Sequence, residues 1–372
     1  MSEGVSAVIF EGSRAISPVE EMMVQVRQAA LLDNLEKMQH VKWLDRIYLH
    51  TNRAELVEPA SFLGATVVLN HIEPGDFHFG NQLQATIAEY GLSRVFCFNG
   101  AGCPLITVDE LNMICRKLLN SENFVYTNNT QSADMVAFTV PANIAAVELP
   151  AMDNSLALTL RDQLNLQMEL MPHSLGLLFD IDTPTDLIVL GAGPFAGPRT
   201  RAVLENMHFD YSRLEAAKAV LGDEYEDVAL IGRVGAPIIG RLNAILKLRL
   251  RVFSEERGMK SLGRIEANEV VSLLGLLIEH TGLEQFFHYL ARVARCAFLD
   301  SRVLMYHYQL DLSDRDRFLS DLGLWEEVKQ PWLREFTRAA AQCPIPVILG
   351  GHSLVSGSLW ALCDELDPGR KA

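Results

Sequence analysis

The chain has 372 residues, which exceeds the usual size of one hydrophobic core and favours two domains. Its formal net charge of −15 argues against non-specific binding to nucleic acid or to an anionic membrane. No apolar stretch reaches the roughly 18 residues of a membrane span, and the N-terminal segment MSEGVSAVIFEG lacks a signal-peptide pattern, so we expect a cytoplasmic protein.

The first 195 residues alternate between strand patterns and helix patterns. Short apolar β-type runs are separated by segments with helical periodicity. This alternation predicts an α/β fold in three layers, a mostly parallel sheet with helices on both faces. We expect strands over 5–10, 46–51, 66–69, 94–98, 124–127, 135–139 and 177–182, and helices over 18–38, 80–90 and 108–119.

A plausible linker, GAGPFAGPRT, occupies 191–200 and carries three glycines and two prolines. It divides the chain into a domain over 1–195 and a second, helix-rich α/β domain over 200–372. In the second domain we expect strands over 227–231, 250–254, 302–307 and 346–349, and helices from 238, over 270–279 and over 283–294.

The segment LLFDIDTPTDLIVL (177–190) interrupts an apolar run with two aspartates, Asp180 and Asp182. On a strand both would point to one face, where a cation or ordered water would have to offset their repulsion. Thr183 is expected as the N-cap of a following helix, with Pro184 in its first turn and Asp186 completing a capping box. Capping accounts for the last three residues without a ligand, whereas the paired aspartates favour a bound cation or ordered water.

Two glycine-containing loops also follow predicted strands. Gly12, Ser13 and Arg14 come directly after the first strand, where a glycine lets backbone amides approach a phosphate. The loop NGAGCPL (99–105) follows another apolar strand, at the sheet edge where ligands bind in open α/β folds. Both loops are equally compatible with tight turns. Asn128, after a further strand, either caps a turn or contacts a ligand.

Strand-end loops of the second half contain a candidate second anion site. Arg233 and Arg257 each follow a predicted strand, and His352 and Ser353 connect a strand to a helix, whose N-terminus favours anions. The alternative for Ser353 is an ordinary helix cap. The six cysteines show no C-x-x-C pair and are expected to be buried, reduced thiols.

Three segments together resemble a known family: EGSRA after the first strand, RVFCFNGAGCPLITVDEL, and LLFDIDTPTDLIVL. Residues 1–195 are similar to MobA-like nucleotidyltransferases of the GT-A (nucleotide-diphospho-sugar transferase) fold, which include molybdenum-cofactor nucleotidyltransferases and 2-phospho-L-lactate guanylyltransferase. The resemblance implies transfer of a nucleotide from an NTP to a phosphorylated small molecule, with Mg²⁺ as cofactor and release of pyrophosphate. Residues 200–372 show no such resemblance.

Carried onto this sequence, the resemblance implies two sets of residues. Asp180 and Asp182 would be the catalytic, metal-side carboxylates, and the nucleotide would contact Gly12, Ser13, Arg14, Asn99, Gly100, Gly102 and Asn128.

The sequence departs from the family pattern at two places. No lysine follows the first loop before Lys37, and Gly102 stands where the family has the aspartate of D-x-P-L. Asp180 is a candidate replacement for that carboxylate, and Arg233 or Arg257 for the cation if the second domain folds over the site. Two alternatives therefore stay open: a nucleotide or nucleotide-sugar binding protein without transfer activity, and an enzyme whose main site lies in the C-terminal domain.

Overall fold

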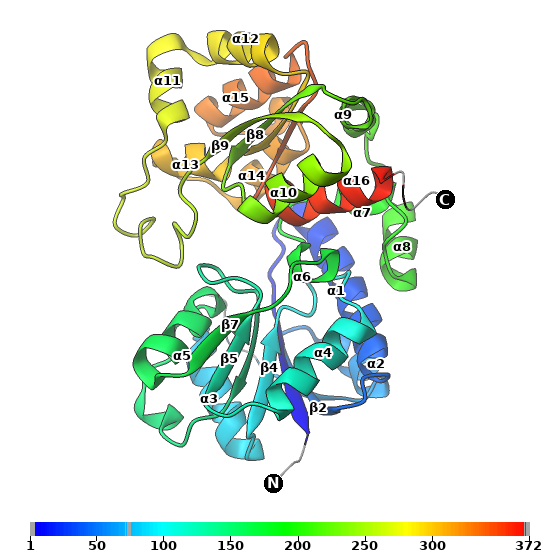
Figure 1. Ribbon diagram of the computed structural model, residues 1–372, viewed down its shortest axis with the longest axis vertical. Coiled ribbons are helices and arrows are strands. Elements are labelled where there is room, and N and C mark those ends of the chain that lie inside the picture. Colours follow the sequence, from blue (N-terminus) through cyan, green and yellow to red (C-terminus); the bar gives the residue numbers. More distant parts are fainter. Residues whose placement is uncertain (1–3, 71, 73–75, 368, 370–372) are drawn as a thin grey trace.

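The computed structural model describes residues 4–70, 72, 76–367 and 369. Two α/β units lie one above the other along the long axis of the molecule (Figure 1). We call the seven-stranded sheet with its helices the first lobe, and the four-stranded sheet with its helices the second lobe.

The first lobe contains a mostly parallel sheet with the strand order β3-β2-β1-β4-β6-β5-β7. Only β6 runs antiparallel to its neighbours β4 and β5. The strands are β1 (Val5–Glu11), β2 (Leu44–Thr51), β3 (Ala65–Leu69), β4 (Arg94–Phe98), β5 (Phe124–Thr127), β6 (Met135–Thr139) and β7 (Gln167–Leu170). The predicted α/β class and the mostly parallel sheet are confirmed.

Alternation along β1 explains why helices cover both faces of this sheet. Ala7 and Ile9 belong to an apolar cluster that contains side chains of α1, α2 and α4. Val8 points the other way, into a cluster with α3 and α5. The helices are α1 (Pro18–Met38), α2 (Val57–Phe62), α3 (Phe79–Tyr90), α4 (Val108–Leu119), α5 (Leu156–Leu164) and α6 (Leu175–Leu178).

The second lobe is built on an all-parallel sheet with the order β11-β10-β8-β9. Leu230 of β8 packs toward α10 and α16, whereas Ile231 packs toward α12 and α15. The strands are β8 (Asp227–Gly232), β9 (Arg249–Ser254), β10 (Cys296–Asp300) and β11 (Val347–Gly350). The helices are α7 (Pro184–Ala192), α8 (Pro198–Glu205), α9 (Ser212–Gly222), α10 (Ala236–Ile245), α11 (Leu273–Thr281), α12 (Leu283–Val293), α13 (Arg302–His307), α14 (Asp314–Asp321), α15 (Pro331–Ala341) and α16 (Leu359–Leu366).

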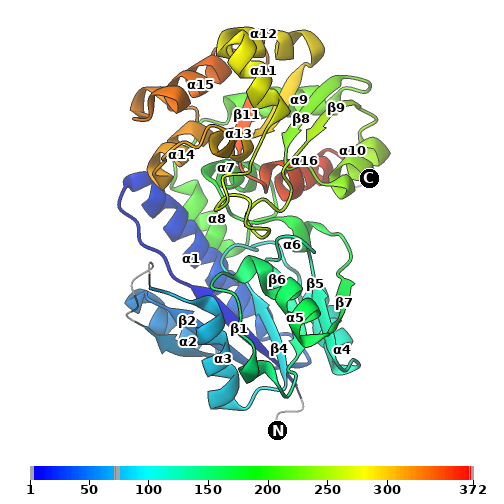
Figure 2. The same ribbon diagram turned by 90° about the vertical axis from the view of Figure 1, so that its left-hand side faces the viewer.

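The two lobes share part of their apolar core. Val26 and Ala30 of α1 belong to the same buried cluster as Leu230 of β8, while Leu35 of the same helix belongs to the core of the first sheet. Helix α1 runs alongside both lobes in the side view (Figure 2). Leu187 of α7 also lies in the cluster of the second sheet. The predicted linker (191–200) overlaps the end of α7 and the start of α8, and the predicted domain limits stay a prediction.

Two predicted strands are wrong. Residues 177–182 contain the end of the short helix α6 and an irregular segment after it. The backbone N–H of Ile181 donates to the carbonyl of Gly102 (2.8 Å) and not to a strand. The strand at that sheet edge is β7, which the sequence pattern missed. Residues 302–307 form helix α13, and the strand lies just before it, at β10. A short apolar run fits either element, so periodicity alone could not decide.

The structure shows the state of the cysteines and the character of the longest helices. All six cysteines are free and five of them are buried. Burial raises the pKa of Cys115 and Cys296 to about 12, which keeps these side chains as thiols. Within the described residues, no helix is both long and apolar enough to cross a bilayer.

Candidate functional site

The carboxyl ends of both sheets open onto one cleft. Its central cavity, of about 280 Å³, is lined by residues that follow β5, β8, β10 and β11, among them Asn129, Arg233, Arg302 and His352. In each sheet the chain order reverses at the first strand, since β1 lies between β2 and β4, and β8 lies between β9 and β10. Ligands of open α/β sheets bind at such reversals. Here two of them belong to one cleft.

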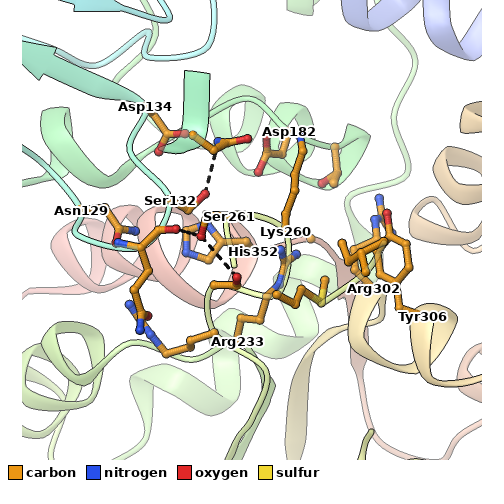
Figure 3. Close-up of a pocket in the computed structure, with 18 of the residues that line it drawn as sticks. Asn129, Ser132, Asp134, Asp182, Arg233, Lys260, Ser261, Arg302, Tyr306 and His352 are labelled. Atoms are coloured by element: carbon orange, nitrogen blue, oxygen red, sulfur yellow. Dashed lines mark hydrogen bonds between the residues drawn. The ribbon is translucent and has the colours of Figure 1, made fainter. Parts of the chain in front are cut away.

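The wall of the central cavity on the first lobe is acidic. Asp134 and Asp182 line it, and Figure 3 shows both on the same side, opposite Arg233. Asp180 lies just behind them, only 7% exposed, and its Oδ1 has no hydrogen-bond partner among the described residues. Burial, and then the charges of Asp182 and Asp134, raise the pKa of Asp180 well above its usual value.

Asp180 occupies space that a side chain at position 102 would need. A Cβ built on Gly102 would overlap Oδ1 of Asp180 and the amide of Asn99. The backbone N–H of Asp180 donates to Oγ of Ser353 (3.3 Å), which holds the carboxylate in this position from the second lobe. Gly102 and Asp180 therefore fit together as a pair, with the carboxylate supplied by position 180.

Asp134 is the second strongly perturbed carboxyl group. Burial and the negative charges of Asp182 and Asp153 raise its pKa to about 8, and the charge of Lys260 opposes part of that shift. At neutral pH such a group holds a proton unless a cation approaches it. The acidic wall therefore favours the binding of a cation or a proton.

Arg27 of α1 ties together the loops on which the acidic wall rests. Its guanidinium donates to Glu11 at the end of β1 (2.9 Å), to Oδ1 of Asn99 after β4 (2.9 Å) and to the carbonyl of Ile181 (3.0 Å). Burial by itself would lower the pKa of Arg27, but the carboxylate of Glu11 outweighs it and the arginine stays charged. Arg27 is consequently committed to structure, and the sequence offered no local signal for it.

The predicted helix cap is confirmed. The backbone N–H of Thr183 donates to Oδ2 of Asp186 (2.8 Å), and the reciprocal capping-box contact is also present at the start of α7. Oδ1 of Asp186 accepts from Oγ of Ser358 (2.7 Å), a residue of the second lobe. This buried anchor fixes the segment that carries Asp182.

On the opposite wall, two arginines already have carboxylate partners. Arg233 donates twice to Asp300 at the end of β10 (2.6 and 3.1 Å), and Arg302 donates twice to Asp321 (2.8 and 2.6 Å). Burial and the charge of Arg233 lower the pKa of His352 to about 4, so its imidazole is neutral near pH 7. These groups give the wall polarity but little unpaired charge.

Two of the cations that line the central cavity have no side-chain partner among the described residues. The side chains of Arg257 and Lys260 make no hydrogen bond or ion pair with another described residue. Both belong to the loop 255–272 between β9 and α11, which extends from the second lobe toward the first (Figure 1). Oγ of Ser261 in this loop donates to the carbonyl of Gln131 in the first lobe. The loop therefore carries free positive charge to the acidic wall.

Two further cavities adjoin the central one. A cavity of about 340 Å³ at the ends of β1 and β2 is lined by Phe10, Gly12, His50 and Phe77, and it shares Lys260 with the central cavity. The rings of Phe10 and His50 stack, with centroids 4.8 Å apart. We call it the aromatic cavity. On the other side lies a cavity of about 510 Å³, which shares Arg257 and His352 with the central one.

The first predicted loop lies at the aromatic cavity. Gly12 lines it, and the backbone N–H of Ser13 donates to Oδ1 of Asn52 (3.2 Å). Oγ of Ser13 accepts from Arg53 (3.3 Å), and Arg14 is exposed. The loop thus has a ligand-sized space beside it, and nucleotide binding by its residues stays a prediction.

The second predicted loop is buried and held by α1. Asn34 donates its side-chain amide to the carbonyls of Gly100 (2.7 Å) and Cys103 (2.9 Å), and a Cβ on Gly100 would meet Ile9 and Leu31 in the core. These contacts favour the tight-turn interpretation for Gly100.

Two amides predicted to bind nucleotide also support the backbone. Oδ1 of Asn99 accepts from Arg27 and from the N–H of Gly102. Asn128 donates to the carbonyl of Leu177 (3.0 Å) and accepts from the N–H groups of Asp134 and Met135. Their polar atoms thus position the acidic wall, and contact with a nucleotide stays a prediction for both.

The carboxylates fit a hard divalent cation in part. Within the described residues, no three His, Cys, Asp or Glu side chains are placed to share a metal ion. Mg²⁺, however, is commonly held by one or two carboxylates, with phosphates and water completing its octahedron. The partnerless Oδ1 of Asp180 beside the exposed Asp182 supplies that smaller donor set.

The sequence pattern missed Lys260, Asp134 as a site residue, and Tyr306. Lys260 lies in a segment without periodicity, and a cation in such a segment is ordinarily only a solvated side chain. A strand end marked Asp134, but nothing local indicated that Asp182 would lie beside it.

No family model matches the chain, and no curated protein matches it. Solved structures with a similar arrangement include a cytidylyltransferase from Leptospira borgpetersenii (TM-score 0.40, 15% identity, 56% of this chain and 98% of that chain). A nucleotidyl transferase from Methanothermobacter has a TM-score of 0.39 and 16% identity over 50% of this chain and 95% of that one. A 4-diphosphocytidyl-2C-methyl-D-erythritol synthase from Anaerococcus prevotii has a TM-score of 0.35 and 12% identity over 55% of this chain and 96% of that one. At TM-scores below 0.5 these likenesses do not establish what this chain binds.

Proposed function

We propose that this protein transfers a nucleotide from an NTP to a phosphorylated small molecule in the cleft between its two lobes. The observation that carries the proposal is the pairing of walls across the central cavity. Asp134 and Asp182 line one wall, with Asp180 behind them, and two cations without side-chain partners line the other. A polyphosphate with a divalent cation satisfies both walls at once, since the metal neutralises the acids and the phosphates take up the cations.

Asp180 and Asp182 are the residues proposed to hold Mg²⁺. When bound, the ion would neutralise phosphate charge and stabilise the charge that develops at the α-phosphorus. The raised pKa of Asp180 supports this role, because a nearby cation offsets the mutual repulsion of the carboxylates.

Arg257 and Lys260 are proposed to bind the triphosphate. The first lobe offers little for this task at its carboxyl edge, since Arg27 is bound to Glu11 and Arg53 contacts Glu55 and Ser13. Lys260 lines both the central and the aromatic cavity, and so lies where a chain of phosphates would pass from one to the other.

The aromatic cavity is proposed to receive the base. Its volume of about 340 Å³ and its Phe10, His50 and Phe77 side chains suit a flat ring, and Gly12 leaves the backbone accessible.

In the proposed reaction, an oxygen of the acceptor's phosphate forms a bond to the α-phosphorus. The bond between the α-phosphorus and the oxygen bridging to the β-phosphate breaks, and pyrophosphate leaves with that electron pair. No proton has to be removed from an ionised phosphate oxygen. The chain's own residues orient the two phosphates and exclude water.

The proposal is tested by nucleotide binding in Asp182→Asn. We expect the α,β-methylene analogue of at least one of ATP, CTP, GTP and UTP to bind the wild-type protein at least tenfold more tightly with Mg²⁺ than without it. The substitution removes the metal-side charge and should abolish that gain without changing metal-free binding. Isothermal titration calorimetry measures both affinities.

Asp109→Asn, an exposed acid at the start of α4, is the matched control and should behave like the wild type. A full magnesium effect in Asp182→Asn would overturn the metal assignment. Release of pyrophosphate from the NTP when phosphate monoesters are added separates transfer from binding without transfer.

A further inference from the structure

The largest of the three adjoining cavities has a different lining from the central one. Its volume is about 510 Å³ and both lobes contribute to it. Apolar side chains form most of its wall, namely Leu170, Leu177, Leu178, Val234, Ile238 and Ile239. We call it the apolar cavity. Leu170, at the end of β7, is 50% exposed although it is a large apolar side chain.

One end of the apolar cavity is polar and contains a cation, Arg257. Arg257 and His352 form part of the boundary with the central cavity, together with Asn129 and Asp134. Arg257 packs over Gly235 at the start of α10, because a Cβ on that glycine would lie 2.6 Å from Nη1 of the arginine. The first N–H groups of α10 have no side-chain cap. A cation and the positive end of a ten-residue helix therefore meet at this boundary.

We propose that the apolar cavity binds the acceptor, and that the acceptor is a phosphate monoester with an apolar body. Its body would lie against the leucine and isoleucine wall. Its phosphate would lie at the boundary with Arg257, facing the central cavity. That this ligand is the acceptor rests on the proposed function, whereas the chemical class of the ligand follows from the cavity itself.

The lining of the central cavity shows why the apolar body needs a separate place. Its walls carry Asp134, Asp182, Arg233 and Lys260, which an apolar group would desolvate without compensation. The apolar cavity offers burial to the body and a charge to the phosphate within one continuous space. A fully polar ligand would leave its leucine and isoleucine wall without a partner.

The binding of alkyl phosphates to the full-length protein, without nucleotide or metal, tests this inference. We expect hexyl phosphate to bind roughly tenfold more tightly than butyl phosphate, because burial of each methylene tightens binding about fourfold at most. Inorganic phosphate should bind more weakly than either, and hexanol should bind at least tenfold more weakly than hexyl phosphate. Isothermal titration calorimetry measures these affinities.

Two variants locate the binding. Leu170→Asp places a negative charge in the apolar wall at an exposed position and should weaken hexyl phosphate binding at least tenfold. Leu324→Asp, at a residue that is 43% exposed and lies elsewhere, is the matched control and should bind like the wild type. Arg257→Gln should remove the preference for hexyl phosphate over hexanol. Melting temperatures of all three variants show that they are folded.

The outcomes separate this inference from the proposed function. Equal affinities for butyl and hexyl phosphate, or an unaltered affinity in Leu170→Asp, would overturn the assignment of the apolar cavity. Chain-length-dependent binding without any magnesium-dependent nucleotide binding would retain the cavity and overturn the transferase. Magnesium-dependent nucleotide binding without alkyl phosphate binding would retain the transferase and overturn the assignment of the apolar cavity.

Discussion

Asp134, Asp180 and Asp182 show how this protein places like charges together at a site. Burial and the charge of Asp182 raise the pKa of both Asp134 and Asp180. Such an arrangement lowers the stability of the folded chain at neutral pH unless a cation or protons are bound. A bound cation would therefore reduce the electrostatic repulsion among these carboxylates.

The pH dependence of the protein's stability should reflect the titration of Asp134. Its pKa is raised to about 8 in the folded protein, whereas an unfolded aspartate titrates near 4. Between those values the folded chain holds the extra proton, so this group makes stability fall as pH rises from about 4 to 8. Asp134→Asn should therefore raise the free energy of unfolding at pH 8 by about 1–3 kcal/mol and flatten the decline. Denaturant unfolding across this pH range measures the effect.

Asp162→Asn is the control for that experiment. Arg161 lowers the pKa of the exposed Asp162, so the substitution should leave the decline of stability toward pH 8 unchanged. An equally steep decline in Asp134→Asn would contradict the assignment of the shift to Asp134.

At the scale of elements, the loop 255–272 matters most because it joins one lobe's charges to the other lobe's acids. It is fastened to its own lobe at both ends: the backbone N–H of Glu255 donates to the carbonyl of Gly232 (3.0 Å), and that of Ser272 donates to Nδ1 of His307 (3.3 Å). Its contact with the first lobe is at Gln131. The position of Lys260 depends on both attachments.

Two glycines of this loop allow the cross-lobe contact to be tested by itself. Gly258 (φ +77°) and Gly263 (φ +69°) both have left-handed backbones, so alanine at either should cost about 1 kcal/mol of stability. Only at Gly258 would the new Cβ press on the other lobe, 3.2 Å from Cβ of Gln131. Gly258→Ala should weaken binding of magnesium pyrophosphate about tenfold.

Gly263→Ala, whose Cβ meets nothing within 4 Å, should keep the wild-type affinity for pyrophosphate. Titration calorimetry compares the two variants. Similar affinities for both would show that the contact with Gln131 does not position the loop for phosphate binding.

At the scale of the whole molecule, α1 makes the two lobes depend on each other. Val26 is fully buried in the cluster that includes the second sheet, and Leu35 is fully buried in the core of the first. One rigid helix cannot lose one set of contacts without disturbing the other. We therefore expect the lobes to unfold together, although each has its own sheet.

Single-tryptophan variants can test this coupling. Trp43 packs against the first-lobe core, and Trp360 belongs to the second-lobe cluster. Fluorescence of either tryptophan should give the same denaturation midpoint. Val26→Ala should lower the free energy of unfolding by roughly 2 kcal/mol and shift both midpoints together. Val293→Ala, at a residue that is 47% exposed, should move neither. Two separate transitions would show that α1 does not couple the lobes.

Much of the fold could be predicted from local patterns. Alternation along β1 and the capping box of Thr183 and Asp186 depend on neighbours a few residues apart, so the sequence determines them directly. Short apolar runs carry less information, which is why β10 was missed and α13 was predicted as a strand. The fold class was therefore predictable, whereas individual short elements were not.

By itself the sequence determined the glycine loops that follow β1 and β4 and the capping box that follows the paired acids, because turn and cap residues are local features. Only the tertiary structure decided which of them meet. Asp180 fills the space left by Gly102, and Arg257 and Lys260 reach a cavity that Asp182 lines. These partners are more than 70 positions apart in the chain, and no short-range pattern records such a distance. The packing of two lobes around α1 brings them together.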